Sequence, residues 1–252
     1  DAVRHSAQAD ETMLIVMSDH GQIATTSAFD LVAALRARGF EAGHRDEAGT
    51  EVLVTPGATA GITLKSGDPV RLQSLGAALM EMPQTGMLFC RACEDGEPVI
   101  DGAFDRALVG ADHSRAPDIY WVGRSCEKAD QHGLAGSGIY TTGVNVPVGG
   151  GMHGGLNPYE MNTLLAFAGA GIAAAHVNDH ANLTDIVPTV LAALGIDRPA
   201  SMTGLPLDAV FGKQAPESRE TRHEAGAGEF RQYLVRAAGS GRQGIPLRGG
   251  RI

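Results

Sequence analysis

The sequence contains no apolar run long enough to cross a membrane. A transmembrane helix needs about 20 consecutive apolar residues, and no run in this chain of 252 residues approaches that length. The first residues also lack the basic segment, apolar segment and cleavage site that make up a signal peptide. These features predict that the chain has no membrane partner, and they favour a cytoplasmic location.

The sequence is also short of positive charge. It has 20 lysine and arginine residues against 29 aspartate and glutamate residues, and its formal net charge is −9. A protein that binds a nucleic-acid polymer neutralises phosphates with basic side chains, so this balance argues against such a partner. An anionic small molecule would need a metal ion or a local basic group to bind its charge. The sequence leaves open whether the chain forms a homo-oligomer.

Cysteine is scarce and odd in number, with Cys90, Cys93 and Cys126 as the full set. Cys90 and Cys93 have the C-x-x-C spacing that occurs in redox and zinc sites. The chain has no second pair of this kind, and residues 86–89 before Cys90 resemble a strand. We therefore interpret the three cysteines as ordinary thiols.

Strand and helix signals alternate along the chain, which favours an α/β fold. Asp68 and Pro69 supply an N-cap and a first-turn proline for one helix, and Pro56 with Gly57 marks a turn between two short strands. The polar residues from Lys213 onwards predict an arm or a partly disordered tail. The expected strands cover residues 13–17, 51–55, 61–65, 87–91 and 119–122, and the expected helices cover residues 29–38, 68–80, 158–168 and 184–194.

An aspartate–histidine pair follows the first expected strand. Residues 13–17 are all apolar, so they predict a strand buried on both faces, as in a parallel sheet. Asp19, His20 and Gly21 come where this strand should end. Ligands and metal ions gather at the carboxyl ends of strands in open α/β sheets. Asp19 and His20 are therefore candidate ligands of a divalent metal ion.

A further candidate, His153, lies in a glycine-rich segment at residues 149–155. Asn157, Pro158 and Glu160 follow it as the N-cap, the first residue and the third residue of a helix with a capping box.

The same glycines match the dinucleotide-binding spacing G-x-G-x-x-G. That pattern needs a helix that opens directly at the loop and an acidic residue about 20 positions on. Asn157 and Pro158 delay the helix here, and Pro147 interrupts the strand before the loop. We interpret the match as chance.

Three segments, taken in order, resemble the alkaline phosphatase superfamily, and most closely its type I phosphodiesterase/nucleotide pyrophosphatase branch. They are residues 13–21, residues 151–160 and residues 183–191, the last continuing to Gly204. The resemblance implies an α/β fold with a mostly parallel sheet flanked by helices and an inserted small α/β cap. It divides the chain into a core strand with a metal motif (1–27), the cap (28–140), a core metal loop with helices (141–212) and a C-terminal arm (213–252).

The resemblance also implies a site. In this family two divalent metal ions, usually zinc, bind the phosphate while a serine or threonine alkoxide attacks phosphorus. Asp19 and His20 would bind the ion that activates the nucleophile, and His153 would bind the other. Such ions lie about 4 Å apart and stabilise the attacking and leaving oxygens. The expected function is metal-dependent hydrolysis of a small anionic phosphoester, similar to that of a phosphodiesterase or nucleotide pyrophosphatase.

The chain departs from the family pattern at the catalytic residues. In the family the nucleophile and the remaining ligands lie upstream of the Asp-His motif, so the sequence assigns no catalytic residue here. Asp1 and His5 have the spacing of a further ligand pair, but residues 6–18 are too few for the family's intervening helix. We interpret Asp1 and His5 as part of the end of a helix. We expect no measurable hydrolase activity from the 252-residue chain alone.

Two alternative functions stay open. The chain is either a non-catalytic, truncated or degenerate homologue, or it hydrolyses a sulfate, phosphonate or phosphomonoester. Two other histidine motifs are less specific. Turn residues follow Asp112 and His113, and His176 and His180 have i, i+4 spacing in a loop or strand setting. We interpret the first motif as insert structure facing the cleft, where His113 or Arg115 could contact substrate, and the second as a polar surface feature.

Overall fold

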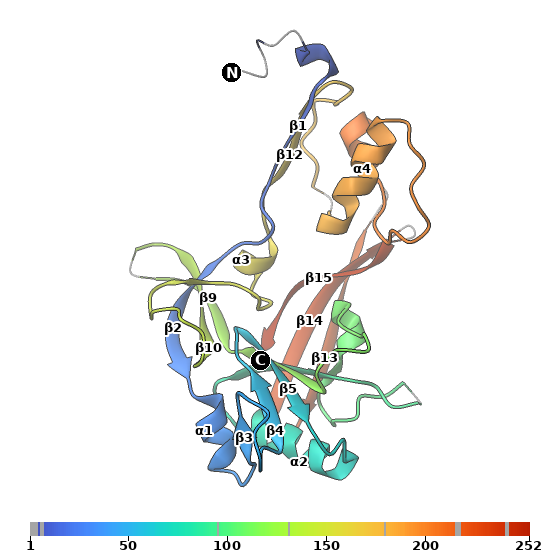
Figure 1. Cartoon of the computed structure of the whole chain (residues 1–252). Coiled ribbons are helices and arrows are strands. Elements are labelled where there is room, and N and C mark those ends of the chain that lie inside the picture. The colour runs from blue at the N-terminus through green and yellow to red at the C-terminus, as the bar shows by residue number, and fades with distance from the viewer. Residues whose placement is uncertain are drawn as a thin grey trace. The chain divides into compact units, whose positions relative to one another are not determined.

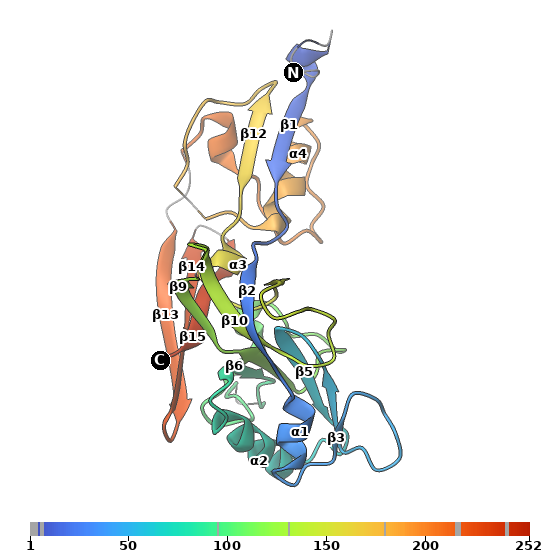
Figure 2. The ribbon, with the colours of Figure 1, turned by 90° about the vertical axis from the view of Figure 1, so that its left-hand side faces the viewer.

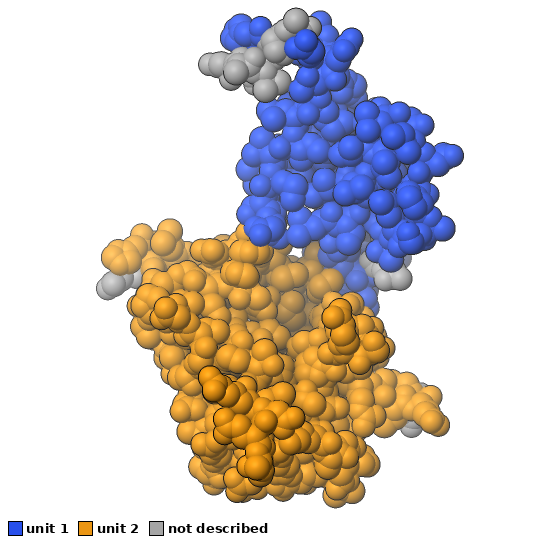
Figure 3. All heavy atoms as spheres, viewed as in Figure 1, with its two compact units in different colours: residues 1–19, 163–221, 236–245 blue, residues 20–162, 222–235, 246–252 orange. Residues whose placement is uncertain are grey.

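The computed structural model describes residues 5, 8–94, 96–130, 132–178, 180–214, 218–239 and 242–252 (Figures 1 and 2). The chain forms two compact units, shown in different colours in Figure 3. Unit 1 consists of residues 1–19, 163–221 and 236–245, and unit 2 consists of residues 20–162, 222–235 and 246–252. The helices of the described part are too short or too polar to cross a membrane.

A six-stranded sheet forms the larger part of unit 2. Its strand order is β3-β4-β5-β8-β6-β7, in which β3–β4 and β6–β7 are parallel and the other three pairs are antiparallel. The strands are β3 (Ala42–Gly43), β4 (Val52–Thr55), β5 (Thr59–Leu64), β6 (Thr85–Cys90), β7 (Phe104–Asp105) and β8 (Ile119–Gly123). The helices of this region are α1 (Leu31–Arg36), α2 (Pro69–Met80) and the 3-10 helix η2 (Arg106–Val109).

Helix α2 packs on this sheet through Leu72, Leu75 and Leu79, which are fully buried. The sequence predicted how the helix starts: Pro69 is at its first turn, and the Asp68 side chain accepts a hydrogen bond from the Val70 N–H. Two consecutive hydrogen bonds cross the core. The Trp121 Nε1 donates to Thr85 Oγ1 at 2.7 Å, and that hydroxyl donates to the Leu79 carbonyl at 2.6 Å. These two hydrogen bonds satisfy the buried Trp121 N–H and the buried Thr85 hydroxyl.

A four-stranded sheet of unit 2, in the order β11-β2-β10-β9, carries the candidate site. Its strands β2, β9 and β10 are labelled in Figure 2. Strand β2 pairs parallel with β10 and antiparallel with β11, and β10 pairs antiparallel with β9. The elements are β2 (Ile23–Phe29), β9 (Ser125–Ala129), β10 (Ala135–Thr141) and β11 (Gly151–Met152), followed by the short helix α3 (Pro158–Met161).

The C-terminal residues form a third sheet in the order β13-β14-β15. Its strands are β13 (Arg219–Ala227), β14 (Phe230–Gly239) and β15 (Arg242–Arg251), and the division between the two units passes through all three. Within unit 2, the Gln232 side chain on β14 accepts from the Leu88 N–H and donates to the carbonyls of Leu88 and Gly102. Partial disorder, one of the two predicted alternatives for the tail, is therefore wrong for these strands.

Unit 1 contains β1 (Met13–Met17) paired antiparallel with β12 (Leu165–Gly169), side by side in Figures 1 and 2. Its helices are η1 (Ala9–Glu11), η3 (Leu183–Asp185), α4 (Ile186–Ala193) and η4 (Asp208–Phe211). Of the described hydrophobic residues that are buried, Ala237 alone belongs to this unit. Buried polar contacts hold the unit instead. The Asp185 carboxylate accepts from the N–H groups of Asn182 and Leu205.

The predicted fold class is wrong. Strand residues make up 36% of the structure and helix residues 19%, and the small sheets are mostly antiparallel, so no helix-flanked parallel sheet forms. Short connections are one physical reason. Residues 56–58 alone join β4 to β5, and a link of that length can join antiparallel strands but not parallel ones. Strand β1 is not buried on both faces either, since Leu14 and Val16 are 45% and 46% exposed.

One predicted helix also needs correction, and another is present. The helix expected over residues 158–168 ends at Met161, because Asn162 is extended and residues 165–169 pair with β1 as a strand. The helix from residue 184 is present, with Pro188 in its first turn and Gly195 at positive φ after its end. However, Leu194 is exposed, and the buried residues of α4 are Pro188 and Thr189.

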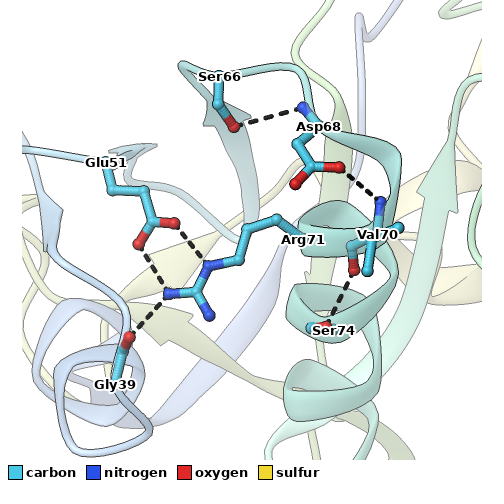
Figure 4. Close-up of polar contacts among 7 residues, drawn as sticks. All are labelled: Gly39, Glu51, Ser66, Asp68, Val70, Arg71 and Ser74. Atoms are coloured by element: carbon cyan, nitrogen blue, oxygen red, sulfur yellow. Dashed lines mark hydrogen bonds and ion pairs between the residues drawn. The ribbon is translucent and has the colours of Figure 1, made fainter.

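Arg71 ties α2 to two neighbouring segments of unit 2 (Figure 4). Its guanidinium donates two hydrogen bonds to the Glu51 carboxylate, at 2.6 and 2.9 Å, and a third to the Gly39 carbonyl at 2.8 Å. It also lies over the Phe40 ring. Hydrogen bonding to Arg71 is the main cause that lowers the pKa of Glu51. The pair therefore stabilises the fold above the usual pKa of glutamate, and this contribution is lost as the pH falls through the lowered value.

We expect Arg71→Gln to lower the free energy of unfolding by about 1 kcal/mol at pH 7, since solvent screens this partly exposed pair. The difference from wild type should shrink as the pH falls below the usual pKa of glutamate and through the lowered pKa of Glu51. Urea unfolding at several pH values measures both effects. Lys65→Met is the control, because its ion pair with Asp46 is more exposed and should contribute less than about 0.5 kcal/mol. A pH-independent loss for Arg71→Gln would contradict the ion-pair interpretation.

Candidate functional site

Strand pairing brings two of the predicted metal ligands together. Strand β11 pairs antiparallel with the start of β2, with Gly151 opposite Ala24 and Met152 opposite Ile23. His153 directly follows β11, and His20 lies three residues before β2. Their imidazole rings stack with centroids 3.6 Å apart and planes 15° from parallel. Residues that are far apart in the sequence thus form one pair of aromatic nitrogen donors, the His20–His153 pair.

The hydrogen bonding of His20 defines its tautomer. Its Nδ1 lies 3.0 Å from the Gly21 carbonyl oxygen, and a carbonyl can only accept, so Nδ1 carries the proton. In the neutral ring, Nε2 is then the nitrogen that carries the lone pair. A backbone carbonyl bonded to the other ring nitrogen is the arrangement that orients histidine ligands in metal sites. His20 is half-buried and His153 is exposed.

The segment after His20 packs closely on helix α3. The Gly21 N–H donates to the Glu160 carbonyl at 2.8 Å. A Cβ atom at Gly21 would overlap the carbonyl oxygen of Tyr159, which is backbone and cannot rotate away. Glycine at position 21 is therefore required by close approach of two backbones, as the glycines of such loops often are.

Glu160 is a buried carboxylate that binds the loop following His153. Its Oε1 accepts from the Gly155 N–H at 2.9 Å, and its Oε2 accepts from the Asn157 N–H at 3.2 Å. Burial raises the pKa of Glu160, while these two hydrogen bonds and the nearby His20 act in the opposite direction. The predicted capping box of Asn157 and Glu160 is confirmed. A cavity of about 10 Å³ lies against Glu160, Ser125 and Met152, room for about one water molecule.

The third predicted ligand, Asp19, is an exposed residue that directly precedes His20. It is the last residue of the first segment of unit 1, and His20 is the first residue of unit 2. The structure therefore joins His20 to His153 within unit 2, whereas Asp19 belongs to unit 1.

The donor chemistry of the His20–His153 pair fits a divalent transition metal ion, because imidazole nitrogens bind zinc well. Ring lone pairs lie in the plane of each ring, so two nearly parallel rings cannot both point at one ion between their faces. They can direct lone pairs to two ions at a separation similar to their own 3.6 Å, which is close to the spacing of two-metal sites. In the described part of the chain, no group of three or more His, Cys, Asp or Glu residues is arranged to hold a metal ion.

The other histidine motifs have different partners. The His113 Nδ1 accepts from the Arg115 N–H at 3.2 Å, and Asp112 pairs with Arg106. His180 lies 3.6 Å from Glu220. Asp1 and Asp179 lie outside the described residues, so the Asp1/His5 pair and the complete His176–His180 motif are not described.

The three cysteines are free thiols. Burial raises the pKa of Cys90 to about 11, so this thiol is a poor nucleophile and metal ligand at neutral pH. Cys93 and Cys126 are exposed.

Sequence reasoning identified Glu160 as a helix-capping residue and missed its hydrogen bonds to the segments that follow both histidines. The signal was present in the spacing. A capping-box carboxylate bonds the backbone just before its helix, and His153 lies only four residues before the N-cap.

Comparisons of the chain with models of protein families, with curated proteins and with solved structures find no match.

We expect Gly21→Ala to lower the free energy of unfolding by about 1–3 kcal/mol, as overpacking against a rigid neighbour does. Urea unfolding measures the loss. Gly43→Ala is the matched control, because a Cβ there would meet its nearest atoms at an ordinary distance of 3.5 Å. Equal stability of the two variants would show that Gly21 does not pack against Tyr159 in this way.

Proposed function

We propose that this chain supplies part of a site for two divalent metal ions, most simply zinc, in a hydrolase of phosphoric esters similar to a phosphodiesterase or nucleotide pyrophosphatase. The observation that carries the proposal is the stacked His20–His153 pair at 3.6 Å. The pair brings together two segments, residues 13–21 and 151–160, whose order along the sequence resembles this family. Asp19, adjacent to His20 in the chain, adds a carboxylate ligand.

Each residue has a distinct role in this proposal. His20, with its proton on Nδ1, offers Nε2 to one metal ion, and the Gly21 carbonyl orients its ring. His153 offers a nitrogen to the other ion from the glycine-rich loop. Asp19 offers carboxylate oxygens beside His20. When bound, two such ions neutralise phosphate charge and stabilise the attacking and leaving oxygens of an in-line displacement.

Metal binding tests the proposal directly. We expect the chain to bind Co²⁺, a spectroscopic substitute for Zn²⁺, and to lose at least tenfold in affinity in His20→Ala and in His153→Ala. A visible-absorption titration, with zinc in competition, measures both affinities. His113→Ala is the matched control, because His113 also follows an aspartate but uses Nδ1 within its own turn. Unchanged affinity in both site variants, or an equal loss in the control, would contradict the proposal.

The ester class is tested with the zinc-loaded chain. We expect it to bind bis(p-nitrophenyl) phosphate more tightly than p-nitrophenyl sulfate, and the zinc-free chain to bind neither. Calorimetry measures binding, and p-nitrophenol absorbance detects turnover. We expect no turnover by the 252-residue chain alone. Tighter binding of the sulfate or of p-nitrophenyl phosphate would favour hydrolysis of that ester instead. Zinc uptake without binding of any ester would favour the non-catalytic alternative.

A further inference from the structure

The side chain of Glu160 fixes the segment that follows His153. Both carboxylate oxygens accept backbone hydrogen bonds, from Gly155 at 2.9 Å and from Asn157 at 3.2 Å. Gly155 lies two residues after His153. An ionised carboxylate accepts hydrogen bonds through both oxygens and donates none. The ionised form of Glu160 therefore satisfies both N–H groups at once.

The main chain of the same residue fixes the segment that follows His20. The Glu160 carbonyl accepts from the Gly21 N–H at 2.8 Å. The Gly21 carbonyl in turn accepts from the His20 Nδ1 at 3.0 Å. Two consecutive hydrogen bonds therefore lead from the Glu160 main chain to the His20 ring.

The surroundings leave these contacts little freedom. A Cβ at Gly155 would lie 2.7 Å from Glu160 Oε2, so a larger residue there would displace the carboxylate. The Asn157 side chain donates to the Cys126 carbonyl on β9 at 3.2 Å, which anchors the loop to the sheet. The pairing of β11 with β2 is only two residues long, so it cannot by itself fix the angle at which the two rings meet.

We propose that Glu160 is the positioning residue of the His20–His153 pair, which it holds in register by binding the backbone after each histidine. Its effect on metal affinity rests on the function proposed above, whereas its effect on the two rings does not. A role limited to capping helix α3, which has only four residues, would leave the rings in place when the carboxylate is replaced.

The test compares Glu160→Gln with a matched variant, Asp185→Asn. Gln keeps the shape of Glu but turns an N–H₂ group towards a backbone N–H, so one of the two hydrogen bonds is lost. Asp185 is also a buried capping-box carboxylate that accepts two backbone N–H groups, but it belongs to unit 1. Glu160→Asp is the second site variant, because its shorter side chain keeps the charge and cannot reach both donors.

The first measurement is proton NMR of the histidine rings in the metal-free chain. We expect nuclear Overhauser effects between the His20 and His153 rings in wild type and in Asp185→Asn, and their loss in Glu160→Gln. Glu160→Asp should weaken them. Loss of the ring contacts to an equal degree in Asp185→Asn would overturn the proposal, and so would their retention in folded Glu160→Gln or Glu160→Asp.

The second measurement is Co²⁺ affinity. We expect a loss of about 10- to 100-fold in Glu160→Gln, as is typical when a partner that orients a metal ligand is removed, and no change in Asp185→Asn. The two proposals can fail separately. In one outcome the wild-type chain binds no Co²⁺, but Glu160→Gln still loses the ring contacts. This result would refute the proposed function and support the positioning role. Wild-type affinity in Glu160→Gln, with binding that still needs His20 and His153, would refute the positioning role alone.

Discussion

The candidate site depends on the antiparallel pairing of Gly151 and Met152 with the first residues of β2. This pairing is the only regular secondary structure that joins the two histidine segments in the described chain. Because it is so short, close packing around it has to define the geometry. Gly21 permits contact with the backbone of α3, and Glu160 binds the segments on both sides. The stacked imidazoles follow from these constraints and not from any contact within one local motif.

The two units are stabilised by different physical interactions. Unit 2 has an apolar core of helices α1 and α2 on a sheet, with one polar chain through Trp121 and Thr85. Unit 1 buries polar groups instead, and its apolar strand β1 remains half exposed. Its order depends on Asp185 and on Thr189, whose hydroxyl donates to the Asp185 carbonyl and accepts from Leu207. The His20–His153 pair belongs to the unit with the apolar core, where rigid strands can hold it.

Local features were predictable from the sequence and long-range ones were not. The cap of α2, the turn at Pro56 and Gly57 and the capping box at Glu160 follow from neighbouring residues, and all three are present. The direction of strand pairing and the strand at residues 165–169 depend on partners elsewhere in the chain. His20 and His153 could be named as candidates, but their contact depends on a pairing that spans more than a hundred residues. The role of Glu160 was missed because its capping function already explained it.

A crystal structure of the zinc-soaked chain, with anomalous diffraction at the zinc edge, tests the two-imidazole site most directly. We predict two anomalous peaks about 4 Å apart, one within bonding distance of His20 Nε2 and the other within bonding distance of a His153 ring nitrogen. Zinc bound elsewhere, with neither imidazole as a ligand in a crystal that leaves both accessible, would contradict the site.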